Sequence, residues 1–203
     1  GATTINAGVL SVGVLANGGA ASGIGQSTNA AANLVLSGGT LQYTGSTVTI
    51  DRNFTLTAST TSFIDVSTAN LTITGVSTAT TGSLTKIGSG TLTLSGSNLY
   101  TGATTINDGT LALGADNGVP SGSAVTIANV AGVIFDLNGF NDTIAALSGV
   151  GPNGEVKITT GKSLTTGDGN NTTYSGLISG AGSLVKQGLG IFTLGGSNTY
   201  SGA

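Results

Sequence analysis

The sequence contains no cysteine, methionine, tryptophan or histidine. Without cysteine the chain forms no disulfide bonds, and cysteine usage therefore does not indicate a redox compartment. Without histidine, a serine nucleophile lacks the general base that usually activates it. These absences argue against nucleophilic catalysis.

Charge is also scarce, because charged residues make up 6% of the chain where about 25% is usual in a soluble domain. The formal net charge is −3, whereas nucleic-acid binding requires a basic surface, so we expect no nucleic-acid partner. No apolar run reaches the roughly 18 residues that a membrane-spanning helix requires. The sequence therefore predicts no such helix.

The residues that are abundant indicate β-structure. Glycine contributes 36 residues, and short alternating runs of leucine, valine and isoleucine are bounded by Gly, Asn and Ser. Alternating runs of this kind are typical of strands. Only two prolines occur, Pro120 and Pro152, both in Gly-rich turns. We predict an almost entirely β chain, with strands at positions that include Thr3–Val12, Asn33–Tyr43, Thr47–Leu56 and Gly90–Leu94.

An internal repeat is the main signal. Residues 82–103 (GSLTKIGSGTLTLSGSNLYTGA) and 182–203 (GSLVKQGLGIFTLGGSNTYSGA) are identical at 14 of 22 positions, without a gap. Residues 1–14 match residues 102–115 in the same way, at an offset of 101. Repetition at a fixed period is the signature of a solenoid or array. We therefore interpret residues 1–203 as a single β-helix fragment with approximate tandem units 1–101 and 102–203, from a protein that is longer at both ends.

Two β architectures compete for this pattern. An antiparallel sandwich would use hairpin turns, for which the candidates are Asn17-Gly18, Asn117-Gly118, Asn138-Gly139 and Asn153-Gly154. The repeat and its small corner residues favour stacked coils of two or three short strands each. The predicted fold is all-β, a right-handed parallel β-helix of about ten coils, with handedness following the crossover rule.

Asparagine is expected at the corners of these coils. Asn98, Asn107 and Asn198 flank predicted strands, where asparagine tolerates the left-handed conformation at low cost. Stacked corner asparagines can also hydrogen-bond from one coil to the next. We therefore expect a structural role for these side chains.

The block from 82 to 113 closely resembles the autotransporter-associated β-strand repeat, also called the passenger-associated transport repeat. The family pattern alternates Gly, Leu, Lys, Asn and Tyr at fixed spacing. It is carried here by Gly82, Leu84, Lys86, Gly88, Gly90, Leu92, Leu94, Gly96, Asn98, Tyr100, Gly102, Thr104, Asn107, Gly109 and Leu111. The second copy carries it at Gly182, Leu184, Lys186, Gly188, Gly190, Leu194, Asn198, Tyr200 and Gly202, with Phe192 in the position of Leu92.

The resemblance implies a passenger segment of a secreted Gram-negative autotransporter, displayed on the cell surface by type V secretion. Translocation across the outer membrane would use a barrel domain outside these residues. The implied function is that of a stalk or adhesive surface that also aids secretion and folding, without enzymatic activity. Candidate partners are molecules on host or neighbouring cells, or other copies of the chain through uncapped ends. The alternative is a carbohydrate-active or carbohydrate-binding β-helix.

A search for catalytic, metal or cofactor sites gives structural interpretations instead. Ser83 or Ser89 could pair with Lys86, but the alternation of the strand predicts that Lys86 points outward. Asp116 and Asp168 lie in loops that could offer oxygen ligands to calcium, yet such residues also form turns by themselves. We therefore predict no catalytic, cofactor or metal site. Carboxylates are spread singly along the chain, at Asp51, Asp65, Asp108, Asp116, Asp136, Asp142, Glu155 and Asp168.

Four tyrosines could stack on sugars, namely Tyr43, Tyr100, Tyr174 and Tyr200. Tyr100 and Tyr200 share one repeat position, so we expect them to pack against neighbouring coils. Asp51 and Arg52 are the only adjacent acid and arginine, and strand alternation would place them on opposite faces.

Overall fold

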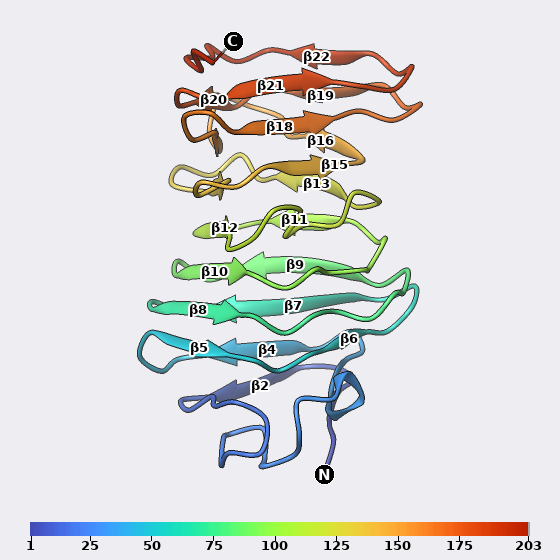
Figure 1. Cartoon of the computed structure of the whole chain (residues 1–203), viewed down its shortest axis with the longest axis vertical. Coiled ribbons are helices and arrows are strands. Elements are labelled where there is room, and N and C mark those ends of the chain that lie inside the picture. Colours follow the sequence, from blue (N-terminus) through green and yellow to red (C-terminus); the bar gives the residue numbers. More distant parts are fainter. Residues whose placement is uncertain (203) are drawn as a thin grey trace.

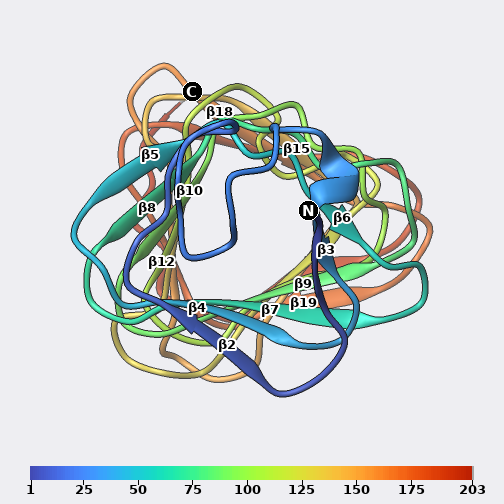
Figure 2. The same ribbon diagram turned by 90° about the horizontal axis from the view of Figure 1, so that it is seen from below.

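The computed structural model describes residues 1–202, which form a solenoid of stacked coils along one axis (Figure 1). The strand pairings within it are parallel. Seen from the N-terminal end, the chain turns clockwise as it recedes from the viewer, so the solenoid is right-handed (Figure 2). The predicted all-β, right-handed parallel β-helix is confirmed, and the antiparallel sandwich is excluded.

Two sheets of seven strands run the length of the solenoid. The first main sheet contains β2 (Val9–Val12), β4 (Thr40–Tyr43), β7 (Thr61–Val66), β9 (Ser83–Ile87), β11 (Thr104–Ile106), β13 (Ala124–Ile127) and β16 (Ala146–Ser148). The second main sheet contains β5 (Val48–Ile50), β8 (Asn70–Ile73), β10 (Thr91–Leu94), β12 (Thr110–Leu113), β14 (Ile134–Asp136), β17 (Glu155–Lys157) and β20 (Leu177–Ser179).

A third face connects the second main sheet back to the first. It is built from two short sheets, the first of β1 (Thr3–Ile5), β3 (Leu34–Leu36) and β6 (Thr55–Leu56), and the second of β15 (Asp142–Ile144), β18 (Ser163–Thr166) and β21 (Ser183–Lys186). The pair β19 (Thr172–Tyr174) and β22 (Phe192–Leu194) continues the first main sheet through a bridge between Gly149 and Tyr174. A short 3-10 turn, η1 (Ala31–Asn33), precedes β3.

Alternation within each strand builds the interior. Because successive side chains of a strand point to opposite faces, Leu92 and Leu94 are buried while Thr91 and Thr93 face outward. Register then stacks the inward residues into columns. One column of buried residues runs through the second main sheet as Leu71, Leu92, Leu111, Phe135, Val156 and Ile178.

The number of coils and the length of the strands both differ from the sequence prediction. Coils mostly span 19 to 24 residues, as from Leu92 to its partner Leu111 (19) or from Leu111 to Phe135 (24), whereas Thr3 and Leu34 lie 31 residues apart. The main sheets therefore hold seven strands each, and the expected count of about ten coils was too high. Predicted strands such as Thr3–Val12 were also too long, because a corner divides it into β1 and β2 at Gly8 (φ 67°).

The left-handed corner positions also differ from the prediction. Positive φ occurs at Asn117 (56°) and Asn138 (48°), which the sequence suggested as hairpin turns, and at Ser59 (59°), while the remaining positive values belong to glycines. Asn98, Asn107 and Asn198 were expected in this conformation and do not adopt it. In this motif glycine adopts the left-handed conformation at the corners. Asn98 and Asn198 instead form hydrogen bonds through their side chains.

Candidate functional site: the corners of the repeat motif

Lys86 occupies a position inside the solenoid. It lies in β9, where its register partners are Ile64 in the coil before and Ile106 in the coil after. Its side chain is 0% exposed. The expectation that Lys86 points outward was wrong, because the strand alternation places residue 86 on the inward side together with Leu84.

The ammonium group of Lys86 closes the corner that follows β9. Its Nζ donates to the carbonyl oxygens of Ile87 (2.9 Å), Gly88 (2.6 Å) and, in the next coil, Asp108 (3.1 Å). These three acceptors match the three donors of an ammonium. Burial lowers the pKa of Lys86 to about 8, against the opposing effect of the nearby carboxylates of Asp108 and Asp65. The arrangement ties two coils together and leaves no nitrogen donor for catalysis.

Asn98 joins three successive coils at the next corner. Its Oδ1 accepts from the amide of Ser77 in the coil before (2.8 Å). Its Nδ2 donates to Gly96 in its own coil (3.2 Å) and to Gly118 in the coil after (2.9 Å). A buried amide side chain stabilises only when it is satisfied in this way. Asn107, by contrast, is exposed.

Tyr100 ends a buried chain of hydroxyl groups. Its Oη and the Thr104 Oγ1 share a hydrogen bond of 2.8 Å, Thr104 shares another of 2.8 Å with Ser123, and Ser123 donates to the carbonyl of Gly102 (2.8 Å). Burial raises the pKa of the Tyr100 hydroxyl well above its usual range. Tyr43 and Tyr174 are buried as well, and Tyr200 packs partly buried against the core. Sugar stacking by the three buried tyrosines is thereby excluded.

The motif glycines lie where neighbouring coils approach most closely. A Cβ added to any of several of them would come within 2.1 to 2.6 Å of a backbone carbonyl oxygen in the preceding coil. Real Cβ atoms do not approach this closely, so a side chain would force the coils apart. The glycines in this situation include Gly82, Gly88, Gly90, Gly96, Gly102, Gly109, Gly182 and Gly188.

The second copy shows the same corner without a coil above it. Lys186 donates to the carbonyls of Gln187 and Gly188 and is exposed, and Asn198 accepts from the amide of Ile178 (2.8 Å). Leu194 is 38% exposed, whereas its counterpart Leu94 is fully buried. The following coil is therefore what buries the motif in the first copy.

The copies also lie on different faces of the solenoid. The strands β9 and β10 lead from the first main sheet to the second, while β21 and β22 lead from the third face to the continuation of the first main sheet. The matching pairs β1–β2 and β11–β12 differ in the same way. The offset of about 100 residues is therefore not a whole number of coils.

The other candidate residues remain apart. The hydroxyl of Ser89 donates to the carbonyl of Ser67 (2.7 Å), and neither Ser83 nor Ser89 is a partner of the Lys86 ammonium. Asp168 accepts from the amide of Asn170 (2.7 Å), which lowers the pKa of its carboxyl. Asp116 accepts from the amide of Asn141 (2.8 Å). Within residues 1–202, no three His, Cys, Asp or Glu side chains gather in a way that could hold a metal ion.

Two further charged residues are buried, which the sequence did not predict. Arg52, the only arginine, is 1% exposed and donates only to oxygens of the segment 16–27. Asp142 is 1% exposed on the inward side of β15, in register with Leu164. Its Oδ1 accepts from the amide of Thr143 (2.9 Å), and its Oδ2 has no partner among the described residues. Burial raises the pKa of Asp142 to about 8.

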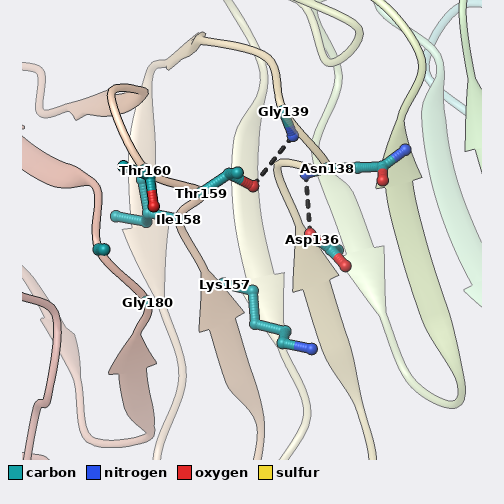
Figure 3. Close-up of a pocket in the computed structure, with 9 residues that line it drawn as sticks. Asp136, Asn138, Gly139, Lys157, Ile158, Thr159, Thr160 and Gly180 are labelled. Carbon is teal, nitrogen blue, oxygen red and sulfur yellow. Dashed lines mark hydrogen bonds between the residues drawn. The ribbon is translucent and has the colours of Figure 1, made fainter.

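A groove of about 460 Å³ lies outside the corner that follows β14 and β17 (Figure 3). Its polar groups mainly hold the corner together, because the Asn138 amide donates to Asp136 (2.8 Å) and the Gly139 amide donates to Thr159 (3.0 Å). The Lys157 side chain extends past Asp136 from the neighbouring strand. The groove is lined by Asp136, Asn138, Gly139, Lys157, Ile158, Thr159, Thr160, Gly180 and Ala181.

Comparison with known proteins identifies the motif. Residues 1–12, 84–113 and 184–203 match the Passenger-associated-transport-repeat family. The chain is 46% identical, over 208 residues, to the adhesin BmaC autotransporter of Brucella suis biovar 1 (strain 1330). That alignment covers 100% of this chain and 6% of the relative. No solved structure matches the chain.

No helix in the described part of the chain is long and apolar enough to span a membrane. The three matched segments are the ones that form the buried corners at Lys86 and Asn98, their second copy at Lys186 and Asn198, and the first coil. These three segments are therefore similar to passenger-associated transport repeats, and the chain carries them on a parallel β-solenoid.

Proposed function

We propose that this segment is a rigid part of the passenger of a large autotransporter, on the outer surface of a Gram-negative bacterium. It acts there as a spacer that extends an adhesive surface away from the cell. The observation that carries the proposal is the coil-to-coil bonding of the motif. Lys86 and Asn98 each bind backbone groups of a neighbouring coil from a buried position, so each coil is supported by the next.

The comparison with an adhesin supports the surface role. The relative is named an adhesin autotransporter, and this chain spans 6% of its length. A segment of this kind contributes mechanical support to the whole passenger rather than catalysis. Among the described residues no three acidic side chains gather, and the Lys86 ammonium is satisfied by backbone carbonyls, which supports that assignment.

The motif residues have a second proposed role, in folding during secretion. A solenoid gains stability as each repeat packs on its neighbour. The coil that packs next on Lys86 or Asn98 supplies a carbonyl oxygen that accepts a hydrogen bond from that buried side chain. Addition of a coil is thereby favoured step by step from an end that is already folded.

Replacement of the segment within its full-length protein tests the proposal. One strain lacks residues 1–203, a second carries an unrelated β-solenoid with the same number of coils, and a third carries the native segment. Adhesion to host cells is measured together with surface display by antibody labelling of intact bacteria. A spacer predicts that deletion reduces adhesion and that the unrelated solenoid restores it.

The alternatives give different results in the same experiment. If only the native segment restores adhesion while display is equal in all strains, the segment is itself the adhesive surface. If deletion changes neither display nor adhesion, the proposed function is wrong.

A further inference from the structure

The first coil is longer than the others and folds differently. Its 31 residues between Thr3 and Leu34 exceed the 19 to 24 of most other coils. Residues 13–33, here called the N-terminal loop, contain the additional length. Seen from below, this blue segment crosses the space that the coils enclose (Figure 2). It therefore lies over the N-terminal end of the interior.

The N-terminal loop buries apolar surface at that end. Leu15 and Ile24 are buried, with Ile24 only 2% exposed, and the inward residues Ile5 and Val12 of the first coil are buried too. The hydroxyl of Thr3 in β1 donates to the carbonyl of Ile24 (3.0 Å). At the opposite end, Lys186 and Leu194 are exposed. The N-terminal loop therefore covers the apolar interior of the first coil.

Arg52, which follows β5 in the second coil, holds the N-terminal loop in place. Its Nε donates to the carbonyl of Ala16 (3.0 Å), its Nη1 to that of Ser27 (2.8 Å), and its Nη2 to that of Gly25 (2.9 Å). Longer bonds of 3.3 Å reach the carbonyls of Asn17 and Ala20. A guanidinium has five donors in a fixed fork, and one buried side chain therefore fixes five points of a loop that has little regular structure.

Asp51 adds a second attachment beside Arg52. Its Oδ1 accepts from the amide of Gly18 (2.7 Å), and its own amide donates to the side chain of Asn17 (3.0 Å). The carboxylate thus bonds the loop rather than the neighbouring guanidinium. Both members of the adjacent acid and arginine pair are committed to the same loop.

We propose that the N-terminal loop is a cap, locked by Arg52, that closes the apolar interior of the solenoid at this point in the repeat array. Repeat proteins need terminal units that cover the last apolar layer, and natural sheets cover exposed ends to prevent association with other chains. A cap here makes the coils that follow it a folding unit with its own interior. This inference concerns folding and assembly, and it does not depend on the adhesive role.

Hydrogen exchange of the purified chain tests the cap. The reporters are the amides of Gly19, which donates to Ser27, and Gly23, which donates to Val14. Arg52→Gln removes most of the hydrogen bonds that the guanidinium donates to the N-terminal loop. Exchange at both amides should therefore be at least tenfold faster, while exchange at the amide of Leu111 in β12 is unchanged. Lys157→Gln is the matched control, because it removes an exposed positive charge of β17. Unchanged exchange at Gly19 and Gly23 in Arg52→Gln would overturn the proposal.

A second variant keeps the proposal testable if Arg52→Gln does not fold. Ile24→Ser removes the apolar anchor of the loop and leaves Arg52 in place. Faster exchange confined to residues 13–33, together with concentration-dependent association in light scattering, is the expected result. Exchange that is unchanged in the loop, or that rises equally in every coil, would show that the loop is not a separate closing element.

Discussion

The buried carboxyl of Asp142 makes a specific prediction about the pH dependence of stability. The side chain lies inside the solenoid with one oxygen lacking a partner, and its pKa rises from 3.8 to about 8. Desolvation is the main cause, the amides of Val119 and Thr143 oppose the shift, and the negative charge of Asp116 adds to it. The negative charge of Asp142 also raises the pKa of the Tyr100 hydroxyl.

The sign follows from proton binding. Between pH 3.8 and 8 the folded chain holds a proton on Asp142 that the unfolded chain has released, so the free energy of unfolding falls as pH rises. The slope is about 1.4 kcal/mol per pH unit. From pH 3.8 to 7, a little over three units, the loss amounts to roughly 4 kcal/mol. The stabilisation by the protonated carboxyl is fully present below the unfolded pKa of 3.8 and is fully lost above the folded pKa of about 8.

Asp142→Asn should remove this dependence while its side-chain oxygen still accepts from the Thr143 amide. Urea unfolding of both proteins, measured at each pH from 4 to 8, should give similar stabilities at pH 4 and a more stable variant at pH 7. Asp168→Asn is the control, because this carboxyl is exposed and its pKa is lowered rather than raised. Parallel curves for the wild type and Asp142→Asn across the whole range would refute the reasoning.

Two further predictions compare matched positions of the chain. Gly88→Ala places a Cβ 2.1 Å from the Asp65 carboxylate at a φ of 77°, and should cost more than 2 kcal/mol in thermal unfolding, whereas Gly161→Ala, with a similar φ of 70° and open space, should cost only about 1 kcal/mol. Equal losses would contradict the close approach of coils. Lys86→Met should destabilise by about 3 kcal/mol, since three buried carbonyls lose their donor, and exposed Lys186→Met by less than about 1 kcal/mol in urea unfolding. A larger loss at Lys186 would contradict the assigned role of the following coil.

Much of the fold could be predicted because its signals are local. Alternation in a run such as Thr91–Leu94 depends only on the two-residue period of a strand, and the repeat showed that one unit recurs. The corners were harder. A run such as Thr3–Val12 is predicted as one continuous strand, and only the left-handed Gly8 divides it, so predicted strands were too long. The coil count was too high because the first coil is longer than the others.

The inward position of Lys86 could not be found by residue type alone. A lysine is rarely fully buried, and strand alternation was interpreted as placing Lys86 outward as well. Alternation nevertheless contained the answer, because residue 86 has the same parity as Leu84 in the strand. What the sequence could not show was the ring of carbonyls from two coils, including Asp108 O, that makes burial of an ammonium tolerable.

The roles of Arg52 and Asp142 depend on contacts between distant segments. Arg52 binds residues 25 to 36 positions earlier in the chain, and no local pattern indicates such a loop. The only signal was composition, since a single arginine in a chain so poor in charge must either face water or be fully satisfied. Asp142 is a similar case, because its inward position depends on the pairing of β15 with β18, where it lies in register with Leu164.

The shift of the motif from one face to the next has a consequence for how the rod presents itself. Corresponding residues of the two copies, such as Ser89 and Leu189, lie on different sides of the solenoid axis, because β9–β10 and β21–β22 occupy different pairs of faces. An antibody or receptor that recognised the outside of this motif would meet it at successive azimuths along the length. Recognition of the two copies would then be possible from two directions around the rod instead of one.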